Sequence, residues 1–500
     1  MTGNWRNDCI FAKEQASIEI NGGEFMYTGE NPAGHTFLLN LKDSDGATLV
    51  VKGGKYHKFN PAASNGENPI ANFVAAGYSS VAEGEYFLVK EGVYNETALK
   101  AAMVDDAEVI LKSDIELTDY LEIRDVDVVI NLNGHTISHS VNSTARYKDV
   151  FEVYGTAELT IEGEGSVVAE DGYSVYATGD SKVNLNGGYY FSPVSVVDAR
   201  KNAIVTINGG EFKVDGTNNS DGDFGQKYTL NLRDKTGNYA GELAAIIVKG
   251  GKFYKYNPAE SQSENPVANF VAEGYSSVVD GDYFLVKEGV YNETALKAAI
   301  AAGETDVTLD ANIDLTSSVE VNRDLVVNLN NKSIKCASSD VFVVTAGTLT
   351  INGEGTVYGS EDNSSSSCAV WAKENGTVII NGGTYKVGHD GASKDANKAN
   401  WRNDCIYARD NAKITINGGE FAYTGDINTE NFQSDGNRFL LNCRDDDYKA
   451  GTSSITVTGG TFHKFNPGAT SSENPVASYV AAGYSSVAGE NNTYVVKKDN

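Results

Sequence analysis

The chain has 500 residues, and its 68 acidic against 40 basic side chains give a formal net charge of −28. A surface of that sign repels nucleic-acid phosphates, so we expect no DNA or RNA partner. No apolar run reaches the roughly 20 residues needed to span a bilayer, and the first ten residues have no signal-peptide pattern, so we also expect no membrane insertion.

The chain repeats a unit of about 200 residues, which is typical of a tandem array. Residues 86–102 recur without a change at 283–299. The segment Gly-Tyr-Ser-Ser-Val occurs three times, starting at Gly77, Gly274 and Gly483. A residue that differs between the copies is therefore not expected to carry chemistry in every copy.

Inside each long unit a shorter theme recurs, a β-branched strand followed by Asn-Gly-Gly and an aromatic residue. It reads Ile-Glu-Ile-Asn-Gly-Gly-Glu-Phe at 18–25 and Ile-Thr-Ile-Asn-Gly-Gly-Glu-Phe at 414–421. The period-two alternation predicts a strand with one buried face, and Asn-Gly-Gly tolerates the positive φ of a sharp corner. Copies about 20 to 40 residues apart suit the coils of a parallel β-solenoid. Asn186 and Asn208 should then stack in a hydrogen-bonded ladder. An antiparallel sandwich or a propeller is the competing interpretation.

This pattern resembles the right-handed parallel β-helix of the pectin-lyase-like superfamily, and the resemblance covers nearly the whole chain. It implies an all-β fold in tandem modules with short capping helices. Residues 96–102 look like the short helix that opens such a module, with Asn95 as its N-cap and Ala98 and Leu99 on one face. The same elements recur at residues 292–299.

Each module should close with the strands around Gly-Tyr-Ser-Ser-Val, because an open terminal coil invites edge pairing. We therefore divide the chain into a partial module at 1–90 and full modules at 91–287 and 288–500. The first piece lacks the capping helix, and its residues 4–10 match residues 400–406 deep inside the third module. We expect either that the chain is the C-terminal part of a longer polypeptide or that a partner covers its first coil.

The copies argue against a catalytic, metal or cofactor site. Cys9 and Cys405 stand where the middle module has Val196, and Cys443 stands where it has Leu232, so these thiols should be small buried hydrophobes. No pair of acidic residues with a basic partner recurs in both full modules. We therefore predict no catalytic residues, no metal site and no cofactor.

Two copies of Trp-Arg-Asn-Asp are the candidate binding residues. Their tryptophans could stack on a sugar, with the arginines and aspartates as hydrogen-bond partners; the residues are Trp5, Arg6, Asp8, Trp401, Arg402 and Asp404. A structural anchor for the preceding loop is the alternative interpretation. The loops at 26–35, 213–227 and 422–438 vary in length between modules, which fits either a binding surface or turns that drift freely.

The modules resemble tandem β-helix repeats of fibre-like proteins of gut bacteriophages and of surface proteins of gut bacteria. We therefore expect a virion fibre at the virion surface, which presents polar loops to host glycans, forms a homo-oligomer (a trimer favoured) and contacts other virion or cell-envelope proteins. A bacterial cell-surface adhesin is the first alternative. A polysaccharide-degrading tailspike-type enzyme is the second, disfavoured because duplicated modules do not provide one specialised cleft.

Overall fold

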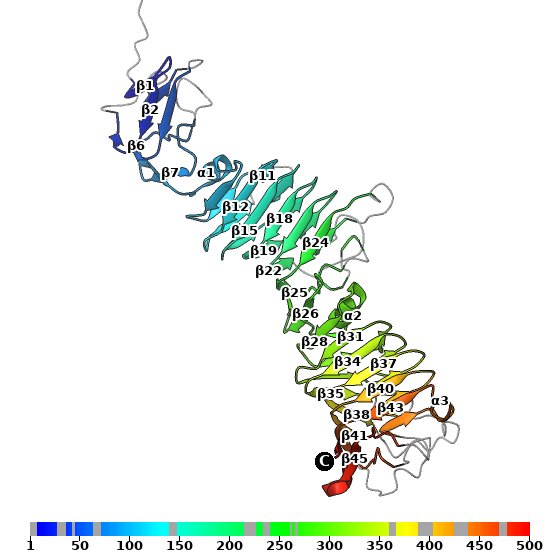
Figure 1. Cartoon of the computed structure of the whole chain (residues 1–500). Helices are drawn as coiled ribbons and strands as arrows, with labels where there is room; N and C mark the ends of the chain where they lie inside the picture. Colours follow the sequence, from blue (N-terminus) through cyan, green and yellow to red (C-terminus); the bar gives the residue numbers. More distant parts are fainter. Residues whose placement is uncertain are drawn as a thin grey trace, which may run out of the picture. The chain divides into compact units, whose positions relative to one another are not determined.

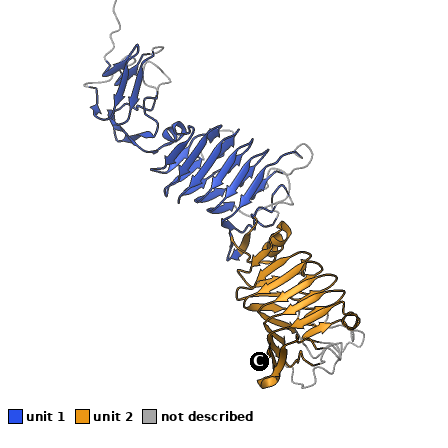
Figure 2. Cartoon of the chain, viewed as in Figure 1, with its two compact units in different colours: residues 1–272, 279–287 blue, residues 273–278, 288–500 orange. Residues whose placement is uncertain are grey.

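A computed structural model provides the fold. It describes residues 8–27, 37–42, 46–63, 72–139, 148–214, 227–233, 241–260, 263–265, 269–359, 367–388, 404–424, 439–469 and 478–500. The chain divides into two compact units, one of residues 1–272 with 279–287 and one of residues 273–278 with 288–500 (Figure 2). No described helix is both long and apolar enough to cross a membrane.

Most of unit 1 is a stack of parallel coils with three strands each (Figure 1). Its first sheet runs β9 (Ala107–Ile110), β12 (Asp127–Asn131), β15 (Glu158–Glu162), β18 (Lys182–Leu185), β21 (Ile204–Ile207) and β24 (Ala245–Val248). The second runs β10 (Ile115–Leu117), β13 (Thr136–His139), β16 (Ser166–Val168), β19 (Tyr189–Ser192), β22 (Glu211–Val214), β25 (Gly251–Tyr254) and β27 (Tyr283–Glu288). The third runs β11 (Leu121–Arg124), β14 (Phe151–Tyr154), β17 (Tyr173–Ala177), β20 (Ser195–Ala199) and β23 (Tyr228–Leu232).

Unit 1 begins with two shorter coils closed by a hairpin. The strands pair as β1 (Ile10–Ala12) with β4 (Leu39–Leu41), β2 (Ser17–Ile20) with β5 (Thr48–Val51), and β3 (Glu24–Phe25) with β6 (Gly54–His57), β8 (Tyr86–Glu91) and β7 (Tyr78–Glu83). The coil strands pair in parallel, whereas β6, β8 and β7 pair antiparallel. The hairpin therefore ends this stack, as the capping prediction requires.

Unit 2 repeats the three-sheet stack. Its first sheet runs β28 (Asp306–Thr308), β31 (Leu325–Asn328), β34 (Thr348–Asn352), β37 (Thr377–Ile380), β40 (Lys413–Ile416) and β43 (Ser454–Val457). The second runs β29 (Ile313–Leu315), β32 (Lys332–Cys336), β35 (Gly355–Tyr358), β38 (Thr384–Gly388), β41 (Glu420–Thr424), β44 (Gly460–His463), β46 (Thr493–Lys498) and β45 (Tyr484–Ala488). The third runs β30 (Val319–Val321), β33 (Phe342–Val344), β36 (Val370–Ala372), β39 (Ile406–Ala408) and β42 (Leu441–Cys443). The remaining elements are β26 (Tyr275–Asp280), the helix α3 (Asp445–Ala450) and the 3₁₀ helix η4 (Glu490–Asn492).

Each coil strand pairs in parallel with the strand three positions later in the chain. This pairing confirms an all-β parallel β-helix and rules out the sandwich and propeller interpretations. The boundary between the two compact units does not fall near residue 90. The division into three modules therefore remains a prediction from the sequence repeats.

The two capping helices form as predicted. The side chain of Asn95 accepts the backbone N–H of Ala98 at 2.9 Å and starts α1 (Glu96–Ala101), with Leu99 fully buried. Asn292 does the same for α2 (Glu293–Ala302) through the N–H of Ala295. Each cap satisfies a backbone donor that the first helical turn leaves without a partner.

Asparagines at the corners stack between coils. The Nδ2 of Asn208 donates to the Oδ1 of Asn186 at 2.8 Å, which confirms the predicted ladder. In unit 2 the ladder is longer, running from Asn417 to Asn381, Asn352 and Asn328 at 2.9, 2.8 and 3.2 Å. The aromatic residues after the corner stack in the core, with ring centroids 4.9 Å apart for Tyr190–Phe212 and 4.8 Å for Phe421–Phe462.

The buried-thiol prediction holds for two of its three cysteines. Cys405 and Cys443 are fully buried, as are Val196 and, nearly so, Leu232 in the middle module. Cys9 is exposed, so the prediction is wrong there. Its strand, β1, has β4 as its one sheet neighbour among the described strands, and no second coil covers it.

The first glycine of a Gly-Gly corner is required where another coil lies beneath it. A Cβ at Gly53 would lie 2.4 Å from the carbonyl oxygen of Asn21, whereas a Cβ at Gly22, in the preceding coil, would meet nothing. We predict that Gly53→Ala destabilises this stack by about 1–3 kcal/mol through overpacking. Hydrogen exchange of Thr48–His57 in the full chain should accelerate. Gly22→Ala is the matched control, and equal exchange in both variants would contradict the close-approach argument.

Candidate functional site

The five-stranded sheet of unit 1 carries a row of polar residues on its outer face. Strand register aligns Glu122, Glu152, Tyr176, Asp198 and Asn231 across β11, β14, β17, β20 and β23. The alternation of strand side chains sends this row away from the core. Even so, Glu152 and Asp198 are only 4% and 1% exposed. Buried carboxyl groups of this kind are candidates for a functional site.

A cleft of about 440 Å³ opens beside this row. It is lined by Lys148, Asp149, Glu152, Tyr154, Asp171, Gly172, Tyr173, Tyr176, Val194 and Arg200. The strands β14 and β17 supply the tyrosines and Glu152, and residues just before or after β14, β17 and β20 supply the rest. The cleft is therefore built from three successive coils.

Two carboxyl groups in the cleft share a hydrogen bond. Asp149 is paired with Glu152, and the Oδ1 of Asp149 also accepts the backbone N–H of Tyr173 at 2.7 Å. The hydroxyl of Tyr154 donates to Glu152. Burial, together with the neighbouring charge of Glu152, raises the pKa of Asp149 to about 7. The carboxyl group of Asp149 is therefore partly protonated near neutral pH.

The third carboxylate of the row is tied into an ion pair. Asp198 accepts the Nε of Arg200 at 2.6 Å and the Nδ2 of Asn231 at 2.7 Å. The Nη2 of Arg200 also lies 3.4 Å from the hydroxyl of Tyr173. These bonds hold Arg200 at the wall of the cleft.

Three tyrosines form the aromatic wall. The ring centroids of Tyr173 and Tyr176 lie 5.8 Å apart with nearly parallel planes, and Tyr154 meets Tyr176 edge-on at 6.1 Å. Arg200 lies over the Tyr176 ring at 5.2 Å. Burial raises the pKa of Tyr173 to about 12, so its hydroxyl remains protonated. Such rings offer an apolar face together with a hydrogen-bonding tip.

The matching sheet of unit 2 carries different side chains. Its row contains Glu320, Val343, Trp371, Tyr407 and Asn442 in register. Here the rings of Trp371 and Tyr407 stack at 6.4 Å. The aromatic character of the outer face is thus common to both units, whereas the carboxyl pair belongs to unit 1.

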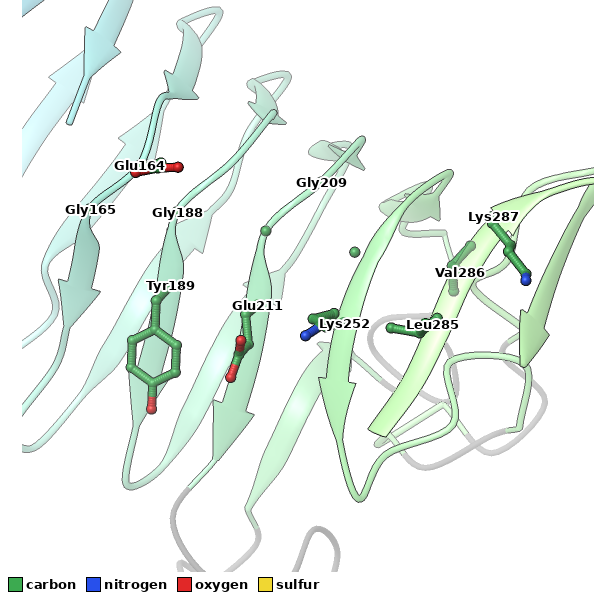
Figure 3. Close-up of a pocket in the computed structure, with 12 residues that line it drawn as sticks. Glu164, Gly165, Gly188, Tyr189, Gly209, Glu211, Lys252, Leu285, Val286 and Lys287 are labelled. Carbon is green, nitrogen blue, oxygen red and sulfur yellow. The ribbon is translucent and has the colours of Figure 1, made fainter. Parts of the chain in front are cut away.

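A second hollow, of about 600 Å³, lies over the glycine corners of unit 1. Figure 3 shows Tyr189, Glu211 and Lys252 beside it on successive strands, with the Leu285–Lys287 segment at one end. Glu211 already accepts the hydroxyl of Tyr283 at 2.8 Å. Coil stacking explains the glycines that line this hollow, since a Cβ at Gly165 would lie 2.3 Å from the carbonyl oxygen of His135 and one at Gly209 2.9 Å from that of Asn186. We therefore favour the tyrosine cleft.

The structure assigns two of the predicted binding residues a place in coil stacking. Asp404 is 1% exposed, and its carboxylate accepts the N–H of Phe439 at 3.1 Å and the Nδ2 of Asn442 at 2.7 Å. Asp8 makes the same pair of bonds, to Phe37 at 3.2 Å and Asn40 at 2.8 Å. These contacts correspond to the structural anchor that the sequence also allowed.

The other predicted binding residues, Trp5, Arg6, Trp401 and Arg402, lie outside the described residues, as do most of the variable loops. Binding by the Trp-Arg-Asn-Asp segments therefore stays a prediction.

Sequence reasoning missed the tyrosine cleft because it sought acids that recur in both full modules. Glu152 and Asp198 occupy positions held by Val343 and Tyr407 in unit 2, so the comparison of copies passed over them. A signal was present: at two outward positions of aligned strands the middle module has the carboxylates Glu152 and Asp198 where the last module has Val343 and Tyr407.

Among the described residues, no group of three or more His, Cys, Asp or Glu side chains is arranged to hold a metal ion. Comparisons of the chain with protein-family models, with curated proteins and with solved structures found no match.

The anchor role of Asp404 can be separated from ligand binding. We predict that Asp404→Ala destabilises unit 2 by about 1–3 kcal/mol, because it leaves the buried N–H of Phe439 and amide of Asn442 without their acceptor. Asp446→Ala, at an exposed aspartate of α3 in the same unit, is the matched control and should leave stability nearly unchanged. Thermal unfolding of the two variants measures the difference, and equal midpoints would contradict the anchor role.

The raised pKa of Asp149 makes the stability of unit 1 depend on pH. An unfolded aspartate has a pKa near 3.9, so between about pH 4 and pH 7 the folded state binds more protons than the unfolded state, and stability falls as pH rises. We predict that Asp149→Asn removes this fall and stabilises unit 1 at pH 8 by on the order of 2 kcal/mol. Hydrogen exchange of β14 at pH 5 and pH 8 tests it, with correction for the intrinsic rate. Glu122→Gln, at an exposed position of the same row, should keep the wild-type slope.

Proposed function

We propose that this protein is a structural and adhesive appendage that binds a glycan in the tyrosine cleft of unit 1. The observation that carries the proposal is the cleft itself: three tyrosines beside fixed hydrogen-bonding groups on a rigid stack of coils. Sugar rings offer apolar faces for stacking and hydroxyls for hydrogen bonds. Ligand sites generally combine aromatic walls with a few fixed polar groups in this way.

We place this appendage in a bacteriophage virion fibre of pectin-lyase-like β-helix type, exposed at the virion surface and assembled as a homo-oligomer, a trimer being favoured. Repeated coils closed by a hairpin and reopened by a capped helix support a spacer that is lengthened by adding modules. A bacterial cell-surface adhesin of the same construction is the alternative setting. Light scattering of the intact chain tests the oligomeric state.

The carboxyl geometry favours binding over cleavage. Retaining glycosidases need two carboxyl groups about 5–5.5 Å apart, and inverting ones about 6.5–9.5 Å. Asp149 and Glu152 are hydrogen-bonded to each other, which is closer than either arrangement. Asp198 is held by Arg200 and Asn231 and is poorly placed to act as a base. Incubation with a bound glycan should therefore release no new reducing ends.

The aromatic wall provides the direct test. A glycan array probed with the labelled full chain should give ligands, and Tyr176→Ala should weaken their binding by about tenfold, the equivalent of about 1.4 kcal/mol of lost stacking. Trp371→Ala changes the register-equivalent residue of unit 2 and is the matched control, expected to leave binding unchanged.

Three results would count against this proposal. Absence of any array signal would contradict glycan binding. Loss of binding in Trp371→Ala with retention in Tyr176→Ala would move the site to unit 2. New reducing ends that disappear in Glu152→Gln would replace the binding role with the enzymatic one.

A further inference from the structure

We infer that the tyrosine cleft selects a sugar that carries a protonated amino group, with the ammonium seated against the carboxyl groups of Asp149 and Glu152. The inference rests on the proposed glycan binding and names the class of sugar. It follows from the balance of charge in the cleft and from its aromatic wall.

The basic side chains that line the cleft already have acidic partners. Arg200 pairs with Asp198 at 2.6 Å, and Lys148 lies 3.8 Å from Asp171. The described ion pairs include none to Asp149 or Glu152, whose described partners are each other, a tyrosine hydroxyl and a backbone N–H. The cleft therefore has an excess of acid without a matching cation.

Among the described residues, the elements around the carboxyl pair supply no cation without an acidic partner. On β11, Arg124 bonds to Glu122 at 2.6 Å and lies over the ring of Tyr154 at 4.5 Å. The described charged or titratable groups that line the cleft or act on its lining residues include Tyr120, Arg124, Lys148, Tyr154, Asp171, Tyr173, Tyr176, Asp198 and Arg200. A uronate or sulfated sugar would add negative charge to this surface and is disfavoured.

An ammonium group would supply the positive charge that the described ion pairs do not bring to Asp149 and Glu152. It has three N–H donors, enough to reach both carboxyl groups, and it is attracted to tyrosine ring faces when partly desolvated. Near neutral pH the carboxyl group of Asp149 still carries a proton in part, because burial raises its pKa to about 7, and an ammonium beside it would favour the ionised form. Binding should therefore release that proton to the buffer and leave both carboxylates ionised against the cation.

A pair of oligosaccharides that differ in the amino group alone tests the inference. Calorimetry of the full chain at pH 6 compares a tetramer of β-1,4-linked glucosamine with the N-acetylated tetramer. We expect the amino form to bind at least about tenfold more tightly, a difference of about 1.4 kcal/mol. Its binding heat should also vary with the ionisation enthalpy of the buffer, which reports proton release.

Glu152→Gln keeps an oxygen acceptor for Tyr154 and removes the charge. It should lower affinity for the glucosamine tetramer about tenfold and abolish the buffer dependence, so that the preference for the amino form over the acetylated form is lost. Glu122→Gln, in the same row but outside the cleft lining, is the matched control and should bind as the wild type does. Asp149→Asn supplies a second variant should Glu152→Gln unfold, as judged by its thermal transition.

The outcomes separate this inference from the proposed function. Equal affinity for the two tetramers, in wild type and Glu152→Gln alike, would overturn ammonium recognition and leave glycan binding intact. Array ligands restricted to anionic or neutral sugars would do the same. No binding to any glycan would overturn both.

Discussion

The close approach of successive coils at the Gly-Gly corners is the constraint on which the rest of this structure depends. At Gly250 and Gly459 the space for a Cβ lies 2.2 Å from an asparagine carbonyl of the coil beneath, so a side chain there would push the coils apart. When successive coils lie at the distance of neighbouring hydrogen-bonded strands, the asparagine ladder, the stacked aromatic core and the parallel sheets can all form. Each of these interactions fails if the corner opens.

Stacking in register also converts sequence positions into rows on the surface. The third sheet of each unit has an outward row in which one position per coil is free to vary while the inward residues fill the core. Unit 1 places Glu152 and Asp198 in that row, and unit 2 places Val343 and Tyr407 at the same positions. A repeated scaffold can therefore acquire a specialised cleft in one module without change to its corners or caps.

Burying Asp149 beside Glu152 is electrostatically unfavourable, and the packed coils around the cleft keep the two groups in place. Two carboxyl groups are buried against each other in a chain that already has an excess of acid, and burial raises the pKa of one of them to about 7. The coils hold this arrangement because the backbone N–H of Tyr173 donates to one oxygen of Asp149 and the hydroxyl of Tyr154 donates to one oxygen of Glu152. Groups kept in an unfavourable state without a ligand are suited to gain from one that brings the opposite charge.

The sequence by itself determined the parallel β-helix, the capping helices after Asn95 and Asn292, the asparagine ladder and the burial of Cys405 and Cys443. All of these follow from patterns within one coil or from comparison of aligned copies. Tertiary structure alone decided that Glu152 and Asp198 are buried and that Asp149 joins Glu152, because strand alternation marks a residue as outward but does not say which segment of another coil covers it. The exposure of Cys9 has the same physical origin, since burial at that position depends on a neighbouring coil.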